Sequence, residues 1–196
     1  MLFRSPNRFT EICATPGGTG AIRNTVSNYS CPGDKVLTTD WYWAPYKTIC
    51  QEIGRDIETY EMFDENGNYN IEAFTAKMQA LVQAQGQLVI LLNTPAHNPT
   101  GYSLSAEDWD AVITAINMAS ADGRITLFVD AAYIDFAGEE EEYRTFLTQL
   151  ETLNENVMAV IGYSASKTLT LYGMRCGAMI CLAADQIGRA SCRERV

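Results

Sequence analysis

The chain has 196 residues, of which 47% are hydrophobic and 19% are charged, and its formal net charge is −10. This composition is typical of a soluble globular domain with a sizeable core. The acidic balance argues against nucleic acid or an anionic membrane as a partner, and no apolar run approaches the length of a membrane span. The six cysteines show no metal-binding spacing and stand mostly in apolar stretches, so we expect reduced core residues, a cytoplasmic protein and no metal site.

Residues 1–10 show little pattern, and the first predicted element is a helix that opens on a glycine-rich turn, within residues 14–29. Glycines let the backbone approach a ligand, and the free N–H groups at a helix start favour a phosphate. Taken alone, the stretch is more typical of a plain helix N-terminus. It matches neither the G-x-G-x-x-G pattern nor a Walker A loop.

Predicted strands and helices alternate along the rest of the chain. Continuous apolar runs, such as residues 87–93, are typical of strands buried on both faces of a parallel sheet. This alternation predicts an α/β domain of three layers with a mostly parallel sheet. The predicted strands are residues 35–39, 56–63, 87–93, 125–133, 157–161 and 178–184, and the predicted helices are 71–84, 105–120 and 143–153.

A lysine and an arginine follow the strand that ends at residue 161. Lys167 is framed by Ser164 and Ser166, and it falls at the sheet edge where open α/β sheets bind ligands. Such an amine can act as a nucleophile. Arg175 suits bidentate phosphate binding, and the Ser164 hydroxyl can donate to the same oxygens. The segment therefore offers a Schiff-base amine and half a phosphate clamp, although a surface lysine and arginine in a loop explain it about equally well.

Two other strand ends carry polar residues. Asn98 lies in the loop TPAHNPTG, which its two prolines make rigid. His97 is the only histidine, and we expect it either to be structural or to support site residues without contacting the ligand. Asp130 is a carboxylate in apolar company, which is costly unless it has a partner. The alternative is an aspartate that caps a nearby turn.

The lysine segment YSASKTLTLYGMRCG resembles the lysine motif of the fold-type I pyridoxal-phosphate enzymes, the aspartate aminotransferase superfamily. Four further segments resemble motifs of that family in the same order: GGTGA, the tryptophan of WYWAPY, HNPTG and DAAY. Each motif is weak alone, but the ordered set is specific. The resemblance covers about residues 14–184, and it implies a partial cofactor-binding large domain over residues 1–186.

The resemblance implies that the cofactor is pyridoxal 5′-phosphate. Lys167 would hold it covalently and carry a proton to and from the substrate. Asp130 would keep the pyridine nitrogen protonated, and Asn98 and Tyr133 would bind the phenolic oxygen.

The remaining cofactor contacts follow from the same resemblance. Trp43 would stack on the ring, with Trp41 as the other candidate and packing of a domain edge as the alternative. The residues implied for the phosphate are Gly18, Thr19, Ser164 and Arg175.

The implied activity is transamination between an amino acid and a 2-oxo acid, by a homodimer, and the HNPTG form points to aspartate or aromatic donors. The same cofactor-binding fold is also used by β-lyases, decarboxylases and synthases, which remain alternatives. A non-enzyme, the aminotransferase-like sensor domain of a transcription regulator, is the other alternative.

Residues 187–196 depart abruptly from the apolar pattern. Their sequence, IGRASCRERV, can be spelled by the codons of a common sequencing adapter. We therefore expect this tail to be non-native and leave it out of the fold argument.

Overall fold

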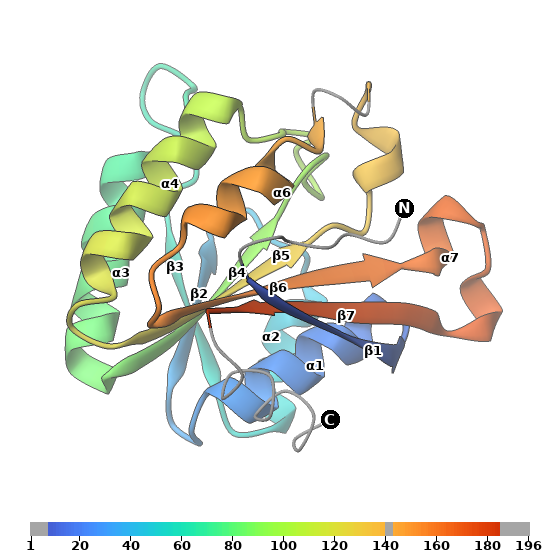
Figure 1. Cartoon of the computed structure of the whole chain (residues 1–196), viewed down its shortest axis with the longest axis horizontal. Coiled ribbons are helices and arrows are strands. Elements are labelled where there is room, and N and C mark those ends of the chain that lie inside the picture. Colours follow the sequence, from blue (N-terminus) through green and yellow to red (C-terminus); the bar gives the residue numbers. More distant parts are fainter. Residues whose placement is uncertain (1–7, 140–142, 185–196) are drawn as a thin grey trace.

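The structure is a computed structural model that describes residues 8–139 and 143–184. Its centre is a seven-stranded sheet in the order β1-β7-β6-β5-β4-β2-β3 (Figure 1). Strands β2 to β6 run parallel, whereas β7 is antiparallel to both of its neighbours, β6 and β1. The predicted α/β fold with a mostly parallel sheet is confirmed. The strands are β1 (Phe9–Pro16), β2 (Lys35–Thr39), β3 (Asp56–Tyr60), β4 (Gln87–Asn93), β5 (Arg124–Asp130), β6 (Val157–Ser164) and β7 (Cys176–Ala183).

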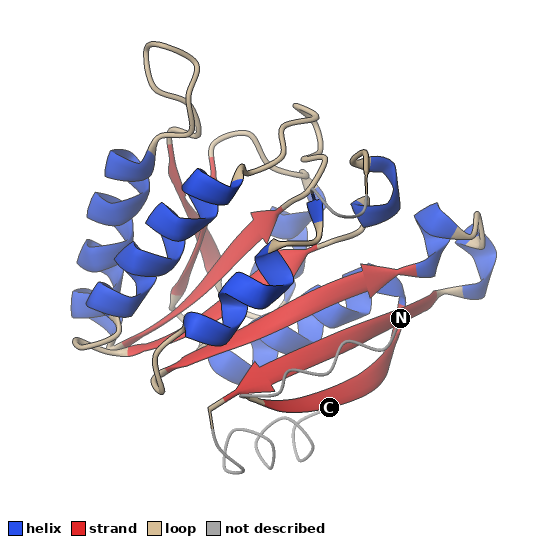
Figure 2. Cartoon of the chain, turned by 45° about the horizontal axis from the view of Figure 1, so that its top comes forward, coloured by secondary structure: helices blue, strands red, loops and turns tan. Residues whose placement is uncertain are grey.

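Helices cover both faces of this sheet, which makes three layers (Figures 1 and 2). On one face lie α3 (Ile71–Gln85), α4 (Ala106–Ala119) and α6 (Phe146–Gln149), and on the other lie α1 (Gly17–Tyr29) and α2 (Pro45–Glu52). Shorter elements are α7 (Ala165–Thr168) and the 3-10 turns η1 (Ile134–Phe136), η2 (Leu150–Thr152) and η3 (Tyr172–Met174).

The central strands are apolar throughout because both of their faces are buried. Along β4, Leu88 and Ile90 pack in the core cluster under α3 and α4, while Val89 and Leu91 pack in the cluster under α1 and α2. Each of these side chains is at most 1% exposed. Full burial of such a side chain contributes roughly 1.5–3 kcal/mol, so the two core layers supply most of the driving force for this fold.

Local signals set the helix boundaries. Ser105 caps α4 by accepting from the Asp108 amide, and the Asp108 carboxylate accepts from the Ser105 amide in return. Asn70 caps α3 at its start, and Gly86 ends it with a φ of 68°, a conformation that favours glycine.

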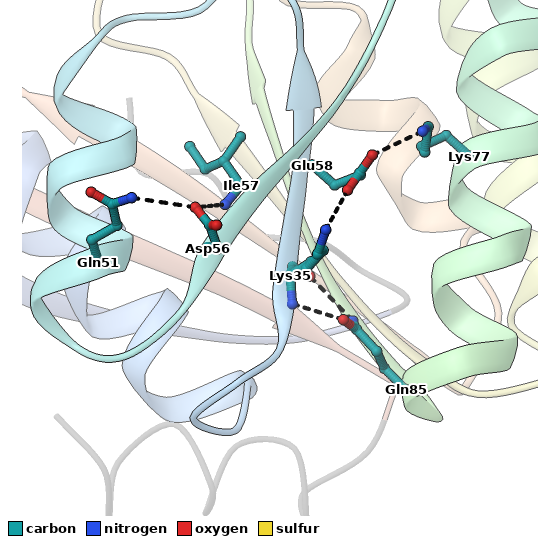
Figure 3. Close-up of polar contacts among 7 residues, drawn as sticks. All are labelled: Lys35, Gln51, Asp56, Ile57, Glu58, Lys77 and Gln85. Atoms are coloured by element: carbon teal, nitrogen blue, oxygen red, sulfur yellow. Dashed lines mark hydrogen bonds and ion pairs between the residues drawn. The ribbon is translucent and has the colours of Figure 1, made fainter.

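An ion-pair cluster ties the edge strand β3 to its neighbours (Figure 3). Glu58 accepts from Lys35 on β2 at 2.8 Å and from Lys77 on α3 at 2.9 Å. Gln85, at the end of α3, accepts from the Lys35 amide and donates to the Lys35 carbonyl. These contacts join β2, β3 and α3 at the edge of the sheet.

Several sequence predictions differ from the structure. Strand β1 was not predicted, because its partner β7 lies far away in the chain and residues 1–10 show no clear alternation. Strand β3 ends at Tyr60 and β5 at Asp130, since the chain turns away from the sheet earlier than the apolar runs suggest. The helix predicted at 143–153 is a short α6 that tightens into η2.

The cysteine prediction holds only in part. Cys50 and Cys181 are buried, but Cys31 and Cys176 are exposed, so the expected core position is wrong for these two. Cys31 follows the end of α1, and Cys176 begins β7 at the rim of the sheet. The tail at 187–196 lies outside the described residues. Within the described ranges, none of the helices is long and apolar enough to cross a bilayer.

Candidate active site

A cavity of about 230 Å³ lies where the carboxyl ends of β4, β5 and β6 meet the N-terminus of α1. Ligand sites of open α/β sheets form at this edge, because loops diverge there from neighbouring strands. The structure brings all of the sequence-predicted site residues to this one cavity: Gly18, Thr19, Trp43, Asn98, Asp130, Tyr133, Ser164, Lys167 and Arg175. Further residues that line it were not assigned roles from sequence: Ile22, Asn93, Ala132, Ser166 and Tyr172.

Asp130 is a buried acid at the end of β5, with 6% of the residue exposed. Its Oδ2 accepts a hydrogen bond of 2.6 Å from the Tyr46 hydroxyl, and its Oδ1 accepts one from the Ala132 amide. Burial raises the pKa of Asp130 above its ordinary value, although these two bonds oppose that effect. In the described part of the chain no cationic side chain pairs with Asp130, so the carboxylate is suited to a cationic group of a ligand.

Tyr46, on α2, is the main residue that sequence reasoning did not assign to the site. It is fully buried, and burial together with the Asp130 charge raises the pKa of its hydroxyl well above the ordinary value. Its ring also meets Trp43 edge-on, with centroids 5.7 Å apart at 90°. The signal in the sequence was the aromatic residue three positions after Trp43.

The two candidate tryptophans differ in place. Trp43 lines the cavity, whereas Trp41 is 55% exposed and is absent from the cavity lining. The edge-on contact with Tyr46 holds the Trp43 ring at the cavity wall. The structure therefore favours Trp43 as the residue that could stack on an aromatic ligand.

The asparagine loop is held in place by Asn93, the last residue of β4. The Asn93 side chain donates to the Asp130 carbonyl at 2.8 Å and accepts from the Asn98 amide at 2.6 Å. The Asn98 side chain in turn donates to the Tyr133 hydroxyl at 3.5 Å. Both Asn98 and Tyr133 thus present polar atoms to the same part of the cavity. Asn93 is a polar residue at the end of an apolar strand, and this pattern could have identified it as a site residue from the sequence.

His97 precedes Asn98 in this loop but is absent from the cavity lining. It is 3% exposed, and its Nδ1 lies 2.8 Å from the Thr100 hydroxyl. Burial lowers the pKa of His97, which favours the neutral ring. This environment agrees with the structural role expected for it.

Lys167 belongs to α7, the turn that directly follows β6. Its Nζ lies 5.4 Å from the centroid of the Tyr133 ring and 5.3 Å from that of Tyr172. Both separations fall within the range of cation–π attraction. The amine therefore lies within reach of two aromatic rings in the lining of the cavity.

The N-terminus of α1 forms an anion cradle with Arg175 and Ser164. A Cβ added at Gly17 would lie 2.8 Å from the Arg175 guanidinium, and one at Gly18 would lie 3.3 Å from the Ser164 Cβ. Glycine therefore lets both side chains approach the helix end. The helix has no side-chain cap and no acidic residue in its first turn, so its N–H groups remain available to an anion.

Ser166 adds an unused donor to this cavity. The residue is 6% exposed, and its hydroxyl has no hydrogen-bond partner among the described residues. An unpaired buried hydroxyl costs free energy unless a ligand satisfies it. Together with the lone Asp130 carboxylate and the anion cradle, it marks a cavity suited to a ligand that carries an anionic group, an aromatic ring and a cationic nitrogen. No metal-binding group of His, Cys, Asp or Glu occurs among the residues that the structure describes.

The fold and cavity together define an α/β domain suited to binding an anionic aromatic cofactor at the carboxyl edge of its sheet. Residues 9–191 match the family described as aminotransferase class I and II, and the chain belongs to that family. The membership confirms the resemblance drawn from the ordered motifs.

Individual relatives agree with this assignment. The aspartate aminotransferase of Salmonella typhi is 32% identical over 174 residues, which cover 87% of this chain and 42% of that enzyme. A crystal structure of an aminotransferase from Anaerococcus prevotii matches with a TM-score of 0.91 and 38% identity, over 96% of this chain and 48% of that one.

A more distant structure shows the shared fold alone. It is an aromatic-amino-acid aminotransferase from Burkholderia pseudomallei covalently bound to pyridoxal phosphate, with a TM-score of 0.76 and 24% identity over 97% of this chain and 48% of that one. The chain spans less than half the length of these relatives.

Proposed function

We propose that the whole protein is a pyridoxal-phosphate-dependent aminotransferase that moves an amino group from an amino acid to a 2-oxo acid. The observation that carries this proposal is one cavity that presents a lysine amine, a buried carboxylate and an anion cradle. Family membership and the names of the relatives support the same activity.

The side chains that line the cavity match the chemical groups of the cofactor. Gly18, Thr19, Ser164 and Arg175 would bind its phosphate, with the dipole of α1 favouring the negative charge. Trp43 would cover one face of its ring. When bound, the cofactor supplies an electron sink for charge that develops on the substrate's α-carbon.

Four other residues would set the positions of the protons. The Asp130 carboxylate would accept a hydrogen bond from the ring nitrogen and keep the proton there, which also relieves the cost of its burial. Asn98 and Tyr133 would donate to the phenolic oxygen. The Lys167 Nζ would hold the cofactor covalently and, once free, move a proton at the substrate's α-carbon.

The substrate and the assembly are narrower proposals. We propose aspartate or aromatic amino donors, on the HNPTG sequence and, for aspartate, on the name of the Salmonella typhi relative. We also propose a cytoplasmic homodimer that engages neither nucleic acid nor membrane. Residues 1–186 would form part of its larger cofactor-binding domain.

An amino-donor panel tests the activity. The whole protein, saturated with pyridoxal phosphate, is assayed with 2-oxoglutarate and a set of amino acids that includes aspartate, phenylalanine and tyrosine. We expect stoichiometric glutamate and the matching 2-oxo acid. Release of ammonia or carbon dioxide in place of glutamate would instead assign a lyase or a decarboxylase, and cofactor binding without any turnover would favour a sensor domain.

A further inference from the structure

The turn that carries Lys167 is too short to hold itself in place. Helix α7 has four residues and no side-chain cap. Isolated helices of this length are unstable, so their position depends on tertiary contacts. Within the turn, the Leu169 amide bonds to the Ala165 carbonyl at 3.1 Å, and the Thr170 amide bonds to the Lys167 carbonyl at 3.3 Å.

Asp135 provides a tertiary contact from another part of the chain. The hydroxyl of Thr168, the residue after Lys167, donates to the Asp135 Oδ2 at 2.5 Å. The Arg144 guanidinium donates to the Asp135 Oδ1 at 2.6 Å. Both carboxylate oxygens are therefore engaged, and the ion pair with Arg144 fixes the orientation in which Asp135 faces Thr168. The Asp135 side chain is only 28% exposed, which limits screening by solvent.

This contact joins two segments that both carry site residues. Asp135 lies in η1, two residues after Tyr133, and Thr168 ends α7, one residue after Lys167. The Lys167 Nζ lies 5.4 Å from the Tyr133 ring, so a shift of α7 against η1 changes the position of the amine relative to the cavity. A displacement on the order of 1 Å can lower a catalytic rate about a hundredfold.

We propose that Asp135 is a positioning residue for Lys167, which acts by holding Thr168 and thereby fixing α7 against the loop of Tyr133. Asp135 itself is absent from the cavity lining, so the proposed role is exerted through Thr168. The catalytic consequence rests on the proposed function, whereas the structural link from η1 to α7 can be measured without it.

The first test is hydrogen exchange on the cofactor-free whole protein. Thr168→Val removes the hydroxyl at nearly constant volume, Thr168→Ser keeps it, and Asp135→Ala removes the acceptor. We expect about tenfold faster exchange at the amides of Leu169 and Thr170 in Thr168→Val and in Asp135→Ala, with wild-type rates in Thr168→Ser. Asp110→Ala, which removes a surface carboxylate that accepts from Gln149, serves as the control and should leave these amides unchanged.

The second test is steady-state kinetics on the loaded enzyme. Thr168→Val and Asp135→Ala should each lower kcat about tenfold with little change in KM for the amino donor, because neither residue lines the cavity. The double variant should lose no more than either single one, since both remove the same link.

Two results would overturn the proposal. One is unchanged exchange at Leu169 and Thr170 in both Thr168→Val and Asp135→Ala. The other is a loss in Thr168→Ser equal to that in Thr168→Val. If the wild-type protein shows no transamination, the proposed function fails, and the exchange rates still decide whether Asp135 holds α7.

Discussion

The hydroxyl of Tyr46 donates a hydrogen bond of 2.6 Å to the Asp130 carboxylate, and the two residues come from α2 and the end of β5. Both side chains are buried, and Asp130 has no cationic partner among the described residues. The pair therefore keeps a buried carboxylate in the domain, which lowers the stability of the cofactor-free protein. The proposed cofactor would bring a cationic nitrogen to this position.

This cost predicts that Asp130→Asn stabilises the cofactor-free protein at about pH 7. Burial raises the pKa of Asp130 in the folded protein. The free energy of unfolding is therefore higher at low pH, where the carboxyl is protonated, and it falls as the pH rises through the folded-state pKa. Removing the charge should raise the free energy of unfolding by on the order of 1 kcal/mol at neutral pH. Urea unfolding of both proteins at several pH values measures this difference in the free energy of unfolding.

The gain in stability should come with a loss of function. An amide cannot keep the ring nitrogen protonated as a carboxylate does, so Asp130→Asn should bind the cofactor and lose several orders of magnitude in rate. Asp122→Asn, at an exposed turn, is the matched control and should change neither property. A stability loss in Asp130→Asn that is independent of pH would show that the buried charge carries no such cost.

Tyr46→Phe tests the partner of this acid. The variant keeps the buried ring but leaves the Asp130 Oδ2 without its donor. We expect a loss of about 1.5–3 kcal/mol in the stability of the cofactor-free protein at neutral pH, because the bond involves a charged acceptor. In the double variant with Asp130→Asn the loss should shrink. Equal losses in both backgrounds would mean that the Tyr46 hydroxyl acts independently of Asp130.

Gly17→Ala should block the anion cradle. Gly17 has a φ of +72°, and a Cβ there would meet the Arg175 guanidinium at 2.8 Å. Gly33→Ala is the control, because Gly33 has a φ of +92° but open space around it. Both variants should lose about 1–2 kcal/mol of stability from backbone strain. Only Gly17→Ala should also weaken the binding of pyridoxal phosphate, which a titration measures. If both variants bind pyridoxal phosphate equally well, the proposal that this helix end binds the phosphate is contradicted.

The Glu58 cluster predicts a pH dependence unrelated to the site (Figure 3). Hydrogen bonds from Lys35 and then Lys77 lower the pKa of Glu58. The ion pairs of Glu58 therefore stabilise the folded protein above the ordinary pKa of 4.5. This stabilisation is lost as the pH falls from that value through the folded-state pKa. Because the side chains are 27–48% exposed, we expect Glu58→Gln to cost only about 0.5–1 kcal/mol at neutral pH.

The measurement for this cluster is the difference in unfolding free energy between wild type and Glu58→Gln across that pH range. Glu65→Gln, in an exposed turn, corrects for the general effect of removing one negative charge. A difference that stays constant down to the lowest pH would show that the ion pairs contribute nothing.

Residues whose chemistry depends on near neighbours in the chain could be found from sequence. Lys167 and Asp130 stand beside strand ends that short apolar runs reveal, and the strand order of an α/β sheet brings such ends together. The partnership of Tyr46 with Asp130 spans 84 positions, and that of Asp135 with Thr168 spans 33. Contacts at such separations depend on how α2 and η1 pack against the sheet, which no local pattern specifies.

Strand β1 was missed for the same reason. Every residue of β1 pairs with β7, at the other end of the described chain, and the strand forms through that pairing rather than through a pattern in its own sequence. The buried hydroxyl of Ser166 is a related case. Its neighbour Ser164 could be assigned to the phosphate by resemblance, but only the packed structure shows that Ser166 also faces the cavity without a partner.

The residue to which the cofactor attaches decides whether Lys167 has the proposed role. The whole protein is loaded with pyridoxal phosphate, reduced with borohydride, digested and mapped by mass spectrometry. We expect a single modified residue, Lys167, and no stable modification in Lys167→Ala, with Lys47→Ala as the control that should behave as wild type. Modification at Lys47 or Lys77, or the absence of any modification in the wild-type protein, would contradict it.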